Sequence, residues 1–98
     1  MKILSIGKPK ELLFSLTQET RTQLAKEATE PTKQMIDKGK VLAHYYSPTS
    51  QYLFVIVDYD STEEWMKDLA SNPVMTYYDQ EVYPIVDLVD ALKVAGIT

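Results

Sequence analysis

The chain contains no cysteine, one histidine and one arginine among its 98 residues. Without cysteine it cannot form a disulfide, a thiolate metal site or a cysteine nucleophile. The single histidine, His44, rules out a metal centre built from several histidines of one chain. A site built from aspartate and glutamate is not ruled out by counting, and the sequence predicts no particular metal ligand.

Positive charge and long apolar runs are also scarce. The net charge is −4, and no basic patch of the kind that binds nucleic acid is visible. No segment approaches the length of a membrane span, and the first seven residues are too short an apolar stretch for a secretion signal. We therefore expect a soluble cytoplasmic protein that contacts neither nucleic acid nor membrane. Its length predicts a single domain, 1–98.

The only long apolar run is Tyr52–Val57, whose β-branched and aromatic residues indicate a strand buried on both faces. The sequence Ser61-Thr-Glu-Glu64 that follows is a capping box, in which the Ser61 hydroxyl and the Glu64 carboxylate each accept from the other's backbone N–H. The helix begun there should end at Asn72-Pro73.

The remaining elements follow from periodicity and from proline and glycine positions. A helix should begin at Ser15 or Thr17 and end near Lys38, before Gly39, and Pro31 should kink or restart it. Further strands are predicted at Lys2–Ile6, at Val41–Tyr46 and at Thr76–Tyr83, the last ended by Pro84, and a C-terminal helix at Asp87–Ala95.

This order is β-α-β-β-α-β followed by a helix. It predicts an α+β fold, the ferredoxin-like plan of a four-stranded antiparallel sheet with two helices on one face. If Ser47 pairs with Tyr52 in the hairpin, His44 and Tyr46 share one sheet face and Tyr45 lies on the other. Because the strands are apolar on both sides, a second subunit should cover the face without helices.

Several motifs resemble muconolactone isomerase at matching intervals from about residue 18 to 82. They are Thr22-Gln23-Leu24, Gly39, Asp58-x-x-Ser61 and Pro73…Tyr77-x-Asp79-x-Glu81-Val82. The resemblance implies a dimeric α/β barrel, whose subunits pack their sheets face to face and often assemble further. It also implies a proton shift on an unsaturated lactone without a cofactor. The second strand, Leu42–Tyr46, lacks the basic and tryptophan side chains of that family.

Proton transfer of this kind needs a base, a proton donor and a group that holds the developing enolate charge. His44 is the predicted base, because its ordinary pKa lies nearest neutrality, and Glu27, near the expected kink, is a second candidate. Tyr46 and Tyr77 are the predicted donors. The expected substrate-binding residues are Arg21, which would hold a carboxylate, Tyr45, and Asp79 beside Glu81.

We therefore expect a small cofactor-independent enzyme acting on a carbonyl or lactone compound. Its cavity should lie between the helices and the sheet, walled by the first helix and the second and fourth strands. Two alternatives remain open: a ligand-binding or assembly module without catalysis, and a cofactor-free monooxygenase acting on an aromatic compound. The expected partners are a small-molecule ligand and further copies of the chain, as a homodimer or a larger homo-oligomer.

Overall fold

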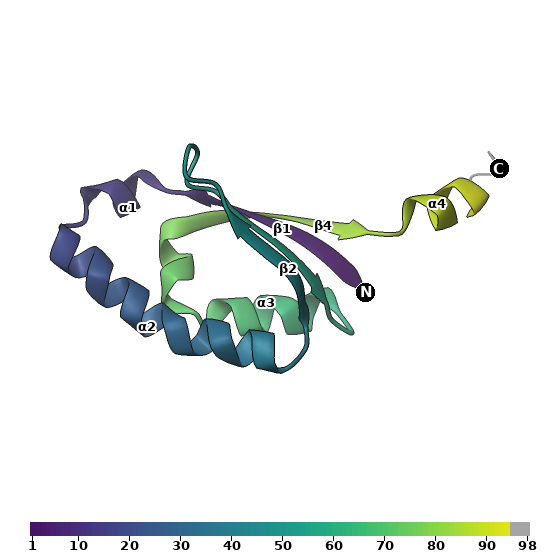
Figure 1. Ribbon diagram of the computed structural model, residues 1–98, viewed down its shortest axis with the longest axis horizontal. Helices are drawn as coiled ribbons and strands as arrows, with labels where there is room; N and C mark the ends of the chain where they lie inside the picture. The colour runs from purple at the N-terminus through teal and green to yellow at the C-terminus, as the bar shows by residue number, and fades with distance from the viewer. Residues whose placement is uncertain (95–98) are drawn as a thin grey trace.

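The computed structural model describes residues 1–94 and confirms the predicted α+β, ferredoxin-like fold (Figure 1). Its elements are β1 (Lys2–Pro9), α1 (Glu11–Ser15), α2 (Gln18–Asp37), β2 (Val41–Tyr46), β3 (Leu53–Asp58), α3 (Thr62–Ala70), the 3₁₀ helix η1 (Pro73–Tyr77), β4 (Tyr78–Ile85) and α4 (Leu88–Val94). The predicted end of the last helix, Ala95, lies outside the described residues.

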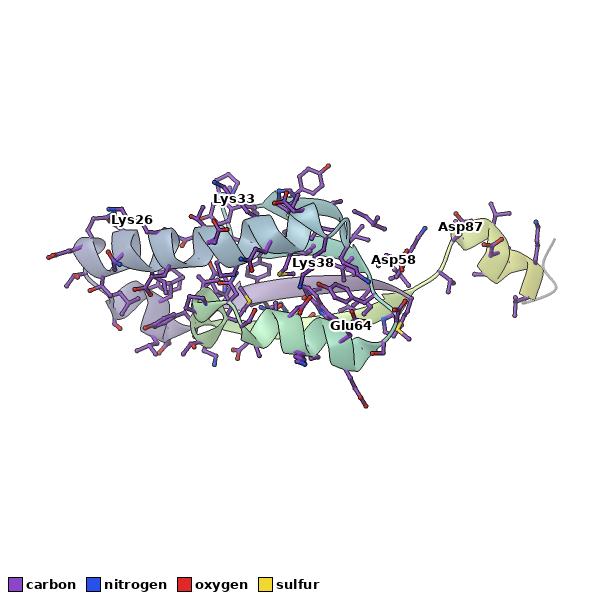
Figure 2. The ribbon with its side chains drawn as sticks, turned by 90° about the horizontal axis from the view of Figure 1, so that it is seen from below. Lys26, Lys33, Lys38, Asp58, Glu64 and Asp87 are labelled. Carbon is purple, nitrogen blue, oxygen red and sulfur yellow. The ribbon has the colours of Figure 1, made fainter. Side chains whose placement is uncertain are left out.

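The four strands form one antiparallel sheet in the order β2-β3-β1-β4, and α2 and α3 lie side by side on one of its faces (Figures 1 and 2). The predicted hairpin register is confirmed, because His44 pairs with Val55 and Tyr46 pairs with Leu53. Between Val41 and Ala43 the pairing shifts by one residue. This β-bulge leaves Leu42 without a partner on β3.

The core lies between α3 and the middle of the sheet. Ile3 on β1 pairs with Val57 on β3, and both are fully buried. Trp65 and Leu69 lie one helical turn apart on α3 and pack on this pair. The ring centroids of Tyr59 and Trp65 are 5.4 Å apart in a tilted arrangement. Each of these apolar side chains stabilises the fold by roughly 1.5–3 kcal/mol relative to leaving it exposed.

Helix α2 is capped by Thr17, whose hydroxyl accepts a hydrogen bond from the Thr20 N–H, and Gly39, with a φ of 72°, lies two residues beyond its end. The helix runs without interruption through Pro31, so the predicted restart is wrong. The carbonyl that proline leaves without a donor is that of Glu27, which lies on the exposed side of the helix. Water can satisfy it there.

The fourth strand differs from its prediction at both ends. It begins at Tyr78, because Pro73–Tyr77 forms a 3₁₀ turn instead, and it continues through Pro84 to Ile85. Since β4 pairs only with β1 and is an edge strand, a proline can lie within it without removing a ladder hydrogen bond.

The start of α3 shows half of the predicted capping box. The Glu64 N–H donates to the Ser61 hydroxyl oxygen at 3.1 Å. The Glu64 carboxylate was expected to accept from the Ser61 N–H, but it lies 3.9 Å from the Lys40 ammonium. The side chain therefore links α3 to the start of β2.

The sheet face away from the helices is mainly apolar. Alternation along β1 turns Ile3 and Ser5 toward the helices and Leu4 and Ile6 away from them. Within residues 1–94 no helix covers these outward side chains. We call this surface the open face; its apolar members are Leu4, Ile6, Ala43, Tyr45, Phe54, Ile56 and Tyr83.

Candidate functional site

A cavity of about 370 Å³ lies between α2 and the sheet. We call it the inner cavity; it is lined by Thr32, Met35, Ile36, Val41, His44, Tyr45, Tyr46, Leu53, Val55, Trp65, Leu69, Asn72, Val74, Met75 and Tyr78. Its walls therefore come from the second half of α2, from β2 and β3, from α3 and η1, and from the first residue of β4. A concave, mostly apolar pocket with a few polar groups is the usual form of a small-molecule site.

The cavity exists because α2 stands away from the sheet. The side of α2 that carries Leu24, Ala28 and Met35 is only half-buried, and no residue of this 20-residue helix is fully buried. The turn η1 separates part of the helix from the strands. There the Asn72 side-chain NH₂ donates to the Thr32 hydroxyl at 3.1 Å. The Asn72 side-chain oxygen accepts from the Val74 N–H at 3.1 Å.

Asn72 is itself buried, so it joins η1 to α2 and holds the rim of the inner cavity. The sequence interpretation took Asn72-Pro73 only as the end of a helix. The same dipeptide also starts η1, with asparagine as the N-cap and proline in its first turn. An asparagine followed by proline is thus the sequence signal that could have predicted η1, which forms part of the cavity wall.

His44 and Tyr46 come from the same face of β2 and lie at the cavity. Side chains two residues apart on a strand are separated by about 6.7 Å, so a bound molecule can meet both. Both residues are exposed and stand on an edge strand. Within residues 1–94 the His44 side chain makes no hydrogen bond, which leaves both ring nitrogens available to a ligand. Tyr45 also borders the cavity, although its side chain is 73% exposed.

Tyr78, rather than the predicted Tyr77, is the β4-side tyrosine of the inner cavity. Burial raises the pKa of the Tyr78 hydroxyl above its ordinary value, and the neighbouring Tyr46 raises this pKa further. Tyr78 therefore keeps its proton at neutral pH and can donate a hydrogen bond. The sequence interpretation missed Tyr78 because it began the strand at Thr76, inside the 3₁₀ turn, and selected Tyr77 instead.

Trp65 forms part of the cavity wall from the core side. Its side chain is 1% exposed, and its indole N–H has no hydrogen-bond partner in the described residues. A buried donor without an acceptor costs roughly 1–3 kcal/mol. Trp65 is also the only tryptophan in the chain, so the tryptophan fluorescence of the protein comes from one side chain of the core that borders this cavity.

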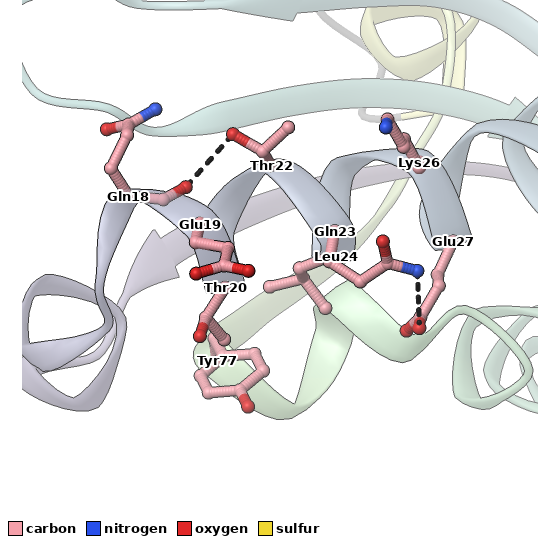
Figure 3. Close-up of a pocket in the computed structure, with 9 residues that line it drawn as sticks. All are labelled: Gln18, Glu19, Thr20, Thr22, Gln23, Leu24, Lys26, Glu27 and Tyr77. Carbon is pink, nitrogen blue, oxygen red and sulfur yellow. Dashed lines mark hydrogen bonds between the residues drawn. The ribbon is translucent and has the colours of Figure 1, made fainter.

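Tyr77 and Glu27 lie at a second hollow on the other side of η1 (Figure 3). This outer groove, of about 640 Å³, is lined by Gln18, Glu19, Thr20, Thr22, Gln23, Leu24, Lys26, Glu27 and Tyr77. The Glu27 carboxylate is exposed and accepts a hydrogen bond from the Gln23 side-chain NH₂ at 3.3 Å. Glu27 therefore lies at the outer groove on the exposed side of α2, and it does not line the inner cavity with His44.

Arg21 is too far along α2 to share a ligand with His44. It precedes Thr32, the first α2 residue at the inner cavity, by about 16 Å along the helix axis at 1.5 Å per residue. Its guanidinium carbon lies 5.9 Å from the centroid of the Phe14 ring, which is a cation–π contact with α1. Arg21 thus holds α1 against α2.

Asp79 and Glu81 point to the open face. The Asp79 carboxylate is 3.8 Å from the Lys10 ammonium and is largely exposed. Glu81 accepts hydrogen bonds from the Lys8 ammonium and, at 2.8 Å, from the Tyr83 hydroxyl. The Lys8 hydrogen bond holds the pKa of the Glu81 carboxyl below its usual value. Of the predicted site residues, the inner cavity therefore gathers His44, Tyr45 and Tyr46.

Among residues 1–94, no lysine or arginine lines the inner cavity. A ligand carboxylate there would find no cation to pair with, and an unpaired charge is costly to bury. Hydrogen-bonding groups are supplied by His44 and the two tyrosine hydroxyls. The cavity can thus accommodate a neutral, mainly apolar molecule with one or two oxygen atoms.

In the part of the chain that the structure describes, no helix combines the length and apolar character needed to cross a membrane. Within residues 1–94, no three metal-ligating side chains of histidine, aspartate or glutamate lie close enough together to hold a metal ion. Comparison of the chain with known proteins found no family model that matches it. No curated protein sequence is significantly similar to it.

Proposed function

We propose that this protein is a cofactor-independent enzyme that transfers a proton on a small carbonyl or lactone compound bound in the inner cavity. One observation carries the proposal: His44, Tyr46 and Tyr78 are together at a cavity whose other walls are mainly apolar. A base and two hydroxyl donors are the groups that enolisation of a carbonyl compound requires.

His44 would take a proton from a carbon beside the carbonyl group. Tyr78, whose pKa is raised by burial, would donate to the carbonyl oxygen as negative charge develops on it. Tyr46, on the opposite edge strand of the sheet, would donate to a second oxygen or replace Tyr78. The protonated imidazole would then return the proton to a different carbon. The apolar walls would limit water, which would otherwise compete for the enolate oxygen.

The substrate class differs in one respect from the expectation that placed Arg21 at a substrate carboxylate. The inner cavity has no cation on its walls, so the preferred compound would be an uncharged unsaturated lactone or cyclic ketone. A volume of about 370 Å³ is within the range of small-ligand pockets. A carboxylate analogue should bind more weakly than its methyl ester.

The test is exchange of the acidic C–H of an unsaturated five-membered lactone in D₂O, followed by proton NMR. His44→Gln should lower the enzymatic exchange rate by 10²-fold or more, the usual contribution of a general base. Tyr83→Phe on the open face is the matched control and should leave the rate unchanged. A His44→Gln variant that retains the full rate would remove His44 from the mechanism.

Binding is measured separately through Trp65 fluorescence. A lactone that quenches Trp65 emission without any exchange of its protons would support a ligand-binding module, the alternative without catalysis. A compound that exchanges without altering Trp65 emission would indicate chemistry outside the inner cavity. The fluorescence measurement therefore tests where the lactone binds, and the exchange measurement tests whether the protein catalyses proton transfer.

A second enzymatic function is favoured by the apolar character of the walls. Oxygenation of an aromatic compound without a cofactor also begins with removal of a substrate proton, and it needs an apolar pocket. The two activities are distinguished by incubating the protein with a polycyclic phenol in an oxygen electrode. Oxygen consumption that requires His44 would favour oxygenation over isomerisation.

We also propose that the protein acts as a homodimer in which a second copy covers the open face. The support is the row of apolar side chains there, including Ile6, Phe54 and Ile56, which no described element of the same chain covers. Phe54→Lys should place a charge in this interface and shift the sedimentation coefficient from dimer to monomer. A wild-type chain that sediments as a monomer at 100 μM would contradict this part of the proposal.

A further inference from the structure

The C-terminal segment of residues 86–94, which we call the arm, extends away from the rest of the molecule (Figures 1 and 2). It consists of Val86, Asp87 and helix α4. Its apolar side chains are exposed: Val86 by 73%, Leu88 by 71%, Val89 by 56% and Val94 by 90%. Such a density of exposed apolar side chains on one short segment indicates a contact surface.

Helix α4 has seven residues, and isolated helices shorter than about 12–15 residues are marginal in water. Its first turn is capped, because the Asp87 carboxylate accepts from the Val89 N–H at 2.9 Å. The cap cannot compensate for the absence of packing. In Figures 1 and 2 the arm projects beyond the sheet and beyond both large helices. Its stability as a helix therefore requires a surface that its own chain does not supply within the described residues.

The surface area of the chain is larger than that of a compact monomer, and the excess can be set against the area that a dimer would bury. The accessible surface is 6738 Å², whereas a compact monomer of this size exposes about 5,700 Å². The Cα radius of gyration is 15.5 Å, against about 13 Å for a compact domain of this length. The excess of about 1,000 Å² is close to the roughly 800 Å² that each partner buries in a standard interface.

The open face alone supplies only part of that area. With strands about 4.8 Å apart and about 3.3 Å per residue, its footprint is roughly 450 Å². Protruding side chains make the real surface larger than this flat footprint. Among the described residues, the arm is the other large apolar surface that remains uncovered. An interface that includes both surfaces would reach the size of a stable dimer.

The strand register indicates where the arm would lie. Lys2 pairs with Ile85 at the end of β4 and with Asp58 at the end of β3, while Val41 at the start of β2 pairs with Val57. The start of β2 and the base of the arm are therefore at the same end of the sheet, on opposite edges. If two copies stack their open faces around a two-fold axis parallel to the strands, the β4 edge of one copy lies over the β2 edge of the other, at the same end of both sheets.

We infer that the arm of each protomer packs against the start of β2 in a second copy of this chain, with Leu42 of the partner subunit as its central contact. Leu42 is the bulge residue and is 52% exposed, so an apolar side chain is available at the place where the symmetry brings the arm. The inference rests on the homodimer proposed above and adds the arm to its interface. The contact is reciprocal, and both arms are engaged in one closed dimer.

The absence of cysteine allows a direct test by cross-linking. Leu42→Cys and Val89→Cys chains are mixed and treated with a short bismaleimide. The 42–89 cross-linked dimer should form in high yield. Thr49→Cys, in the hairpin at the far end of β2, is the matched control and should give at most a tenth of that yield with Val89→Cys. Equal yields, or no 42–89 product from a protein that is dimeric, would overturn the inference.

The second measurement is the dimer Kd of a Leu88→Ser/Val89→Ser variant. We expect it to rise at least tenfold, with Lys93→Ser on the same helix as the control that leaves it unchanged. Because the arm projects away from the sheet and the two large helices among the described residues, the unfolding temperature of the dilute protein should stay the same. A wild-type chain that remains monomeric at 100 μM would overturn both the dimer and the arm contact. If the protein is a dimer and the arm variant has the same dimer Kd as wild type, only the arm contact is overturned.

Discussion

Val55→Phe tests whether the inner cavity is an empty space in the folded protein. Val55 lies in the middle of β3, pairs with His44 and Ser5, and lines the cavity. The phenyl ring would add about 60 Å² of apolar surface, worth about 1.5 kcal/mol if it is buried without strain. Ordering the larger side chain costs about 0.5 kcal/mol. The free energy of unfolding should therefore rise by about 1 kcal/mol.

The assay is urea unfolding followed by Trp65 fluorescence, at one fixed protomer concentration because the proposed dimerisation would couple to unfolding. An increase of 1 kcal/mol corresponds to a rise in Tm of roughly 4–8 °C for a domain of this size. Ile56→Phe, one residue later on the open face, is the control that adds the same kind of ring outside the cavity.

Whether Val55→Phe raises or lowers the free energy of unfolding decides whether the inner cavity is empty. If the space were already filled by side chains, the phenyl ring would overpack the core and destabilise the protein by about 1–3 kcal/mol. A fall in stability would therefore refute the cavity and, with it, the proposed binding site. A stabilised Val55→Phe variant should also lose the lactone-dependent quenching of Trp65, because the ring occupies the volume that the ligand needs.

Two further predictions concern the frame around the cavity. Tyr59→Phe removes the hydrogen bond that the Tyr59 hydroxyl donates to Asp68 at 2.7 Å, and should lower the free energy of unfolding at pH 7 by about 1.5 kcal/mol in urea titrations. Burial, and then the Asp68 hydrogen bond, raise the pKa of folded Tyr59 above its ordinary 10.0. The stabilisation is therefore complete below pH 10 and is lost progressively as the pH rises above 10. If the difference in free energy of unfolding between wild type and Tyr59→Phe stays constant up to pH 11, the assignment is contradicted. Ser61→Ala removes the N-cap of α3 and should cost about 1 kcal/mol in the same assay, whereas Ser61→Gly should cost only a few tenths. Equal losses in these two variants would show that the cap hydrogen bond is not the cause.

The local elements follow from the sequence because their causes are local. Thr17 and Gly39 bound α2 through a cap and a left-handed φ, and the hairpin pairing followed from turn length and alternation. The same reasoning predicted that His44 and Tyr46 share a sheet face. It did not identify Tyr78, which the alternation along β4 turns toward the helices together with Gln80 and Val82, whereas Tyr77 lies in the 3₁₀ turn before the strand.

The candidate site was predicted less completely, since it depends on distances between elements. Arg21 and Glu27 are on the same helix as the cavity wall, but the rise of the α-helix carries Arg21 beyond the reach of His44, and Glu27 lies at the outer groove instead. Asp79 alternates to the open face once β4 pairs with β1. No pattern along the chain could show that α2 would stand away from the sheet and leave a hollow there.

The amino-acid sequence thus determined the order of elements, the hairpin register and the exclusion of cysteine chemistry, because capping, alternation and composition act over a few neighbouring residues. The tertiary structure alone decided which side chains meet. The inner cavity joins Trp65, Asn72 and Tyr78 to His44 and Tyr46, and the arm projects away from the other described elements. Which side chains come together depends on how far apart the helices and strands pack, and that distance is a property of the whole fold.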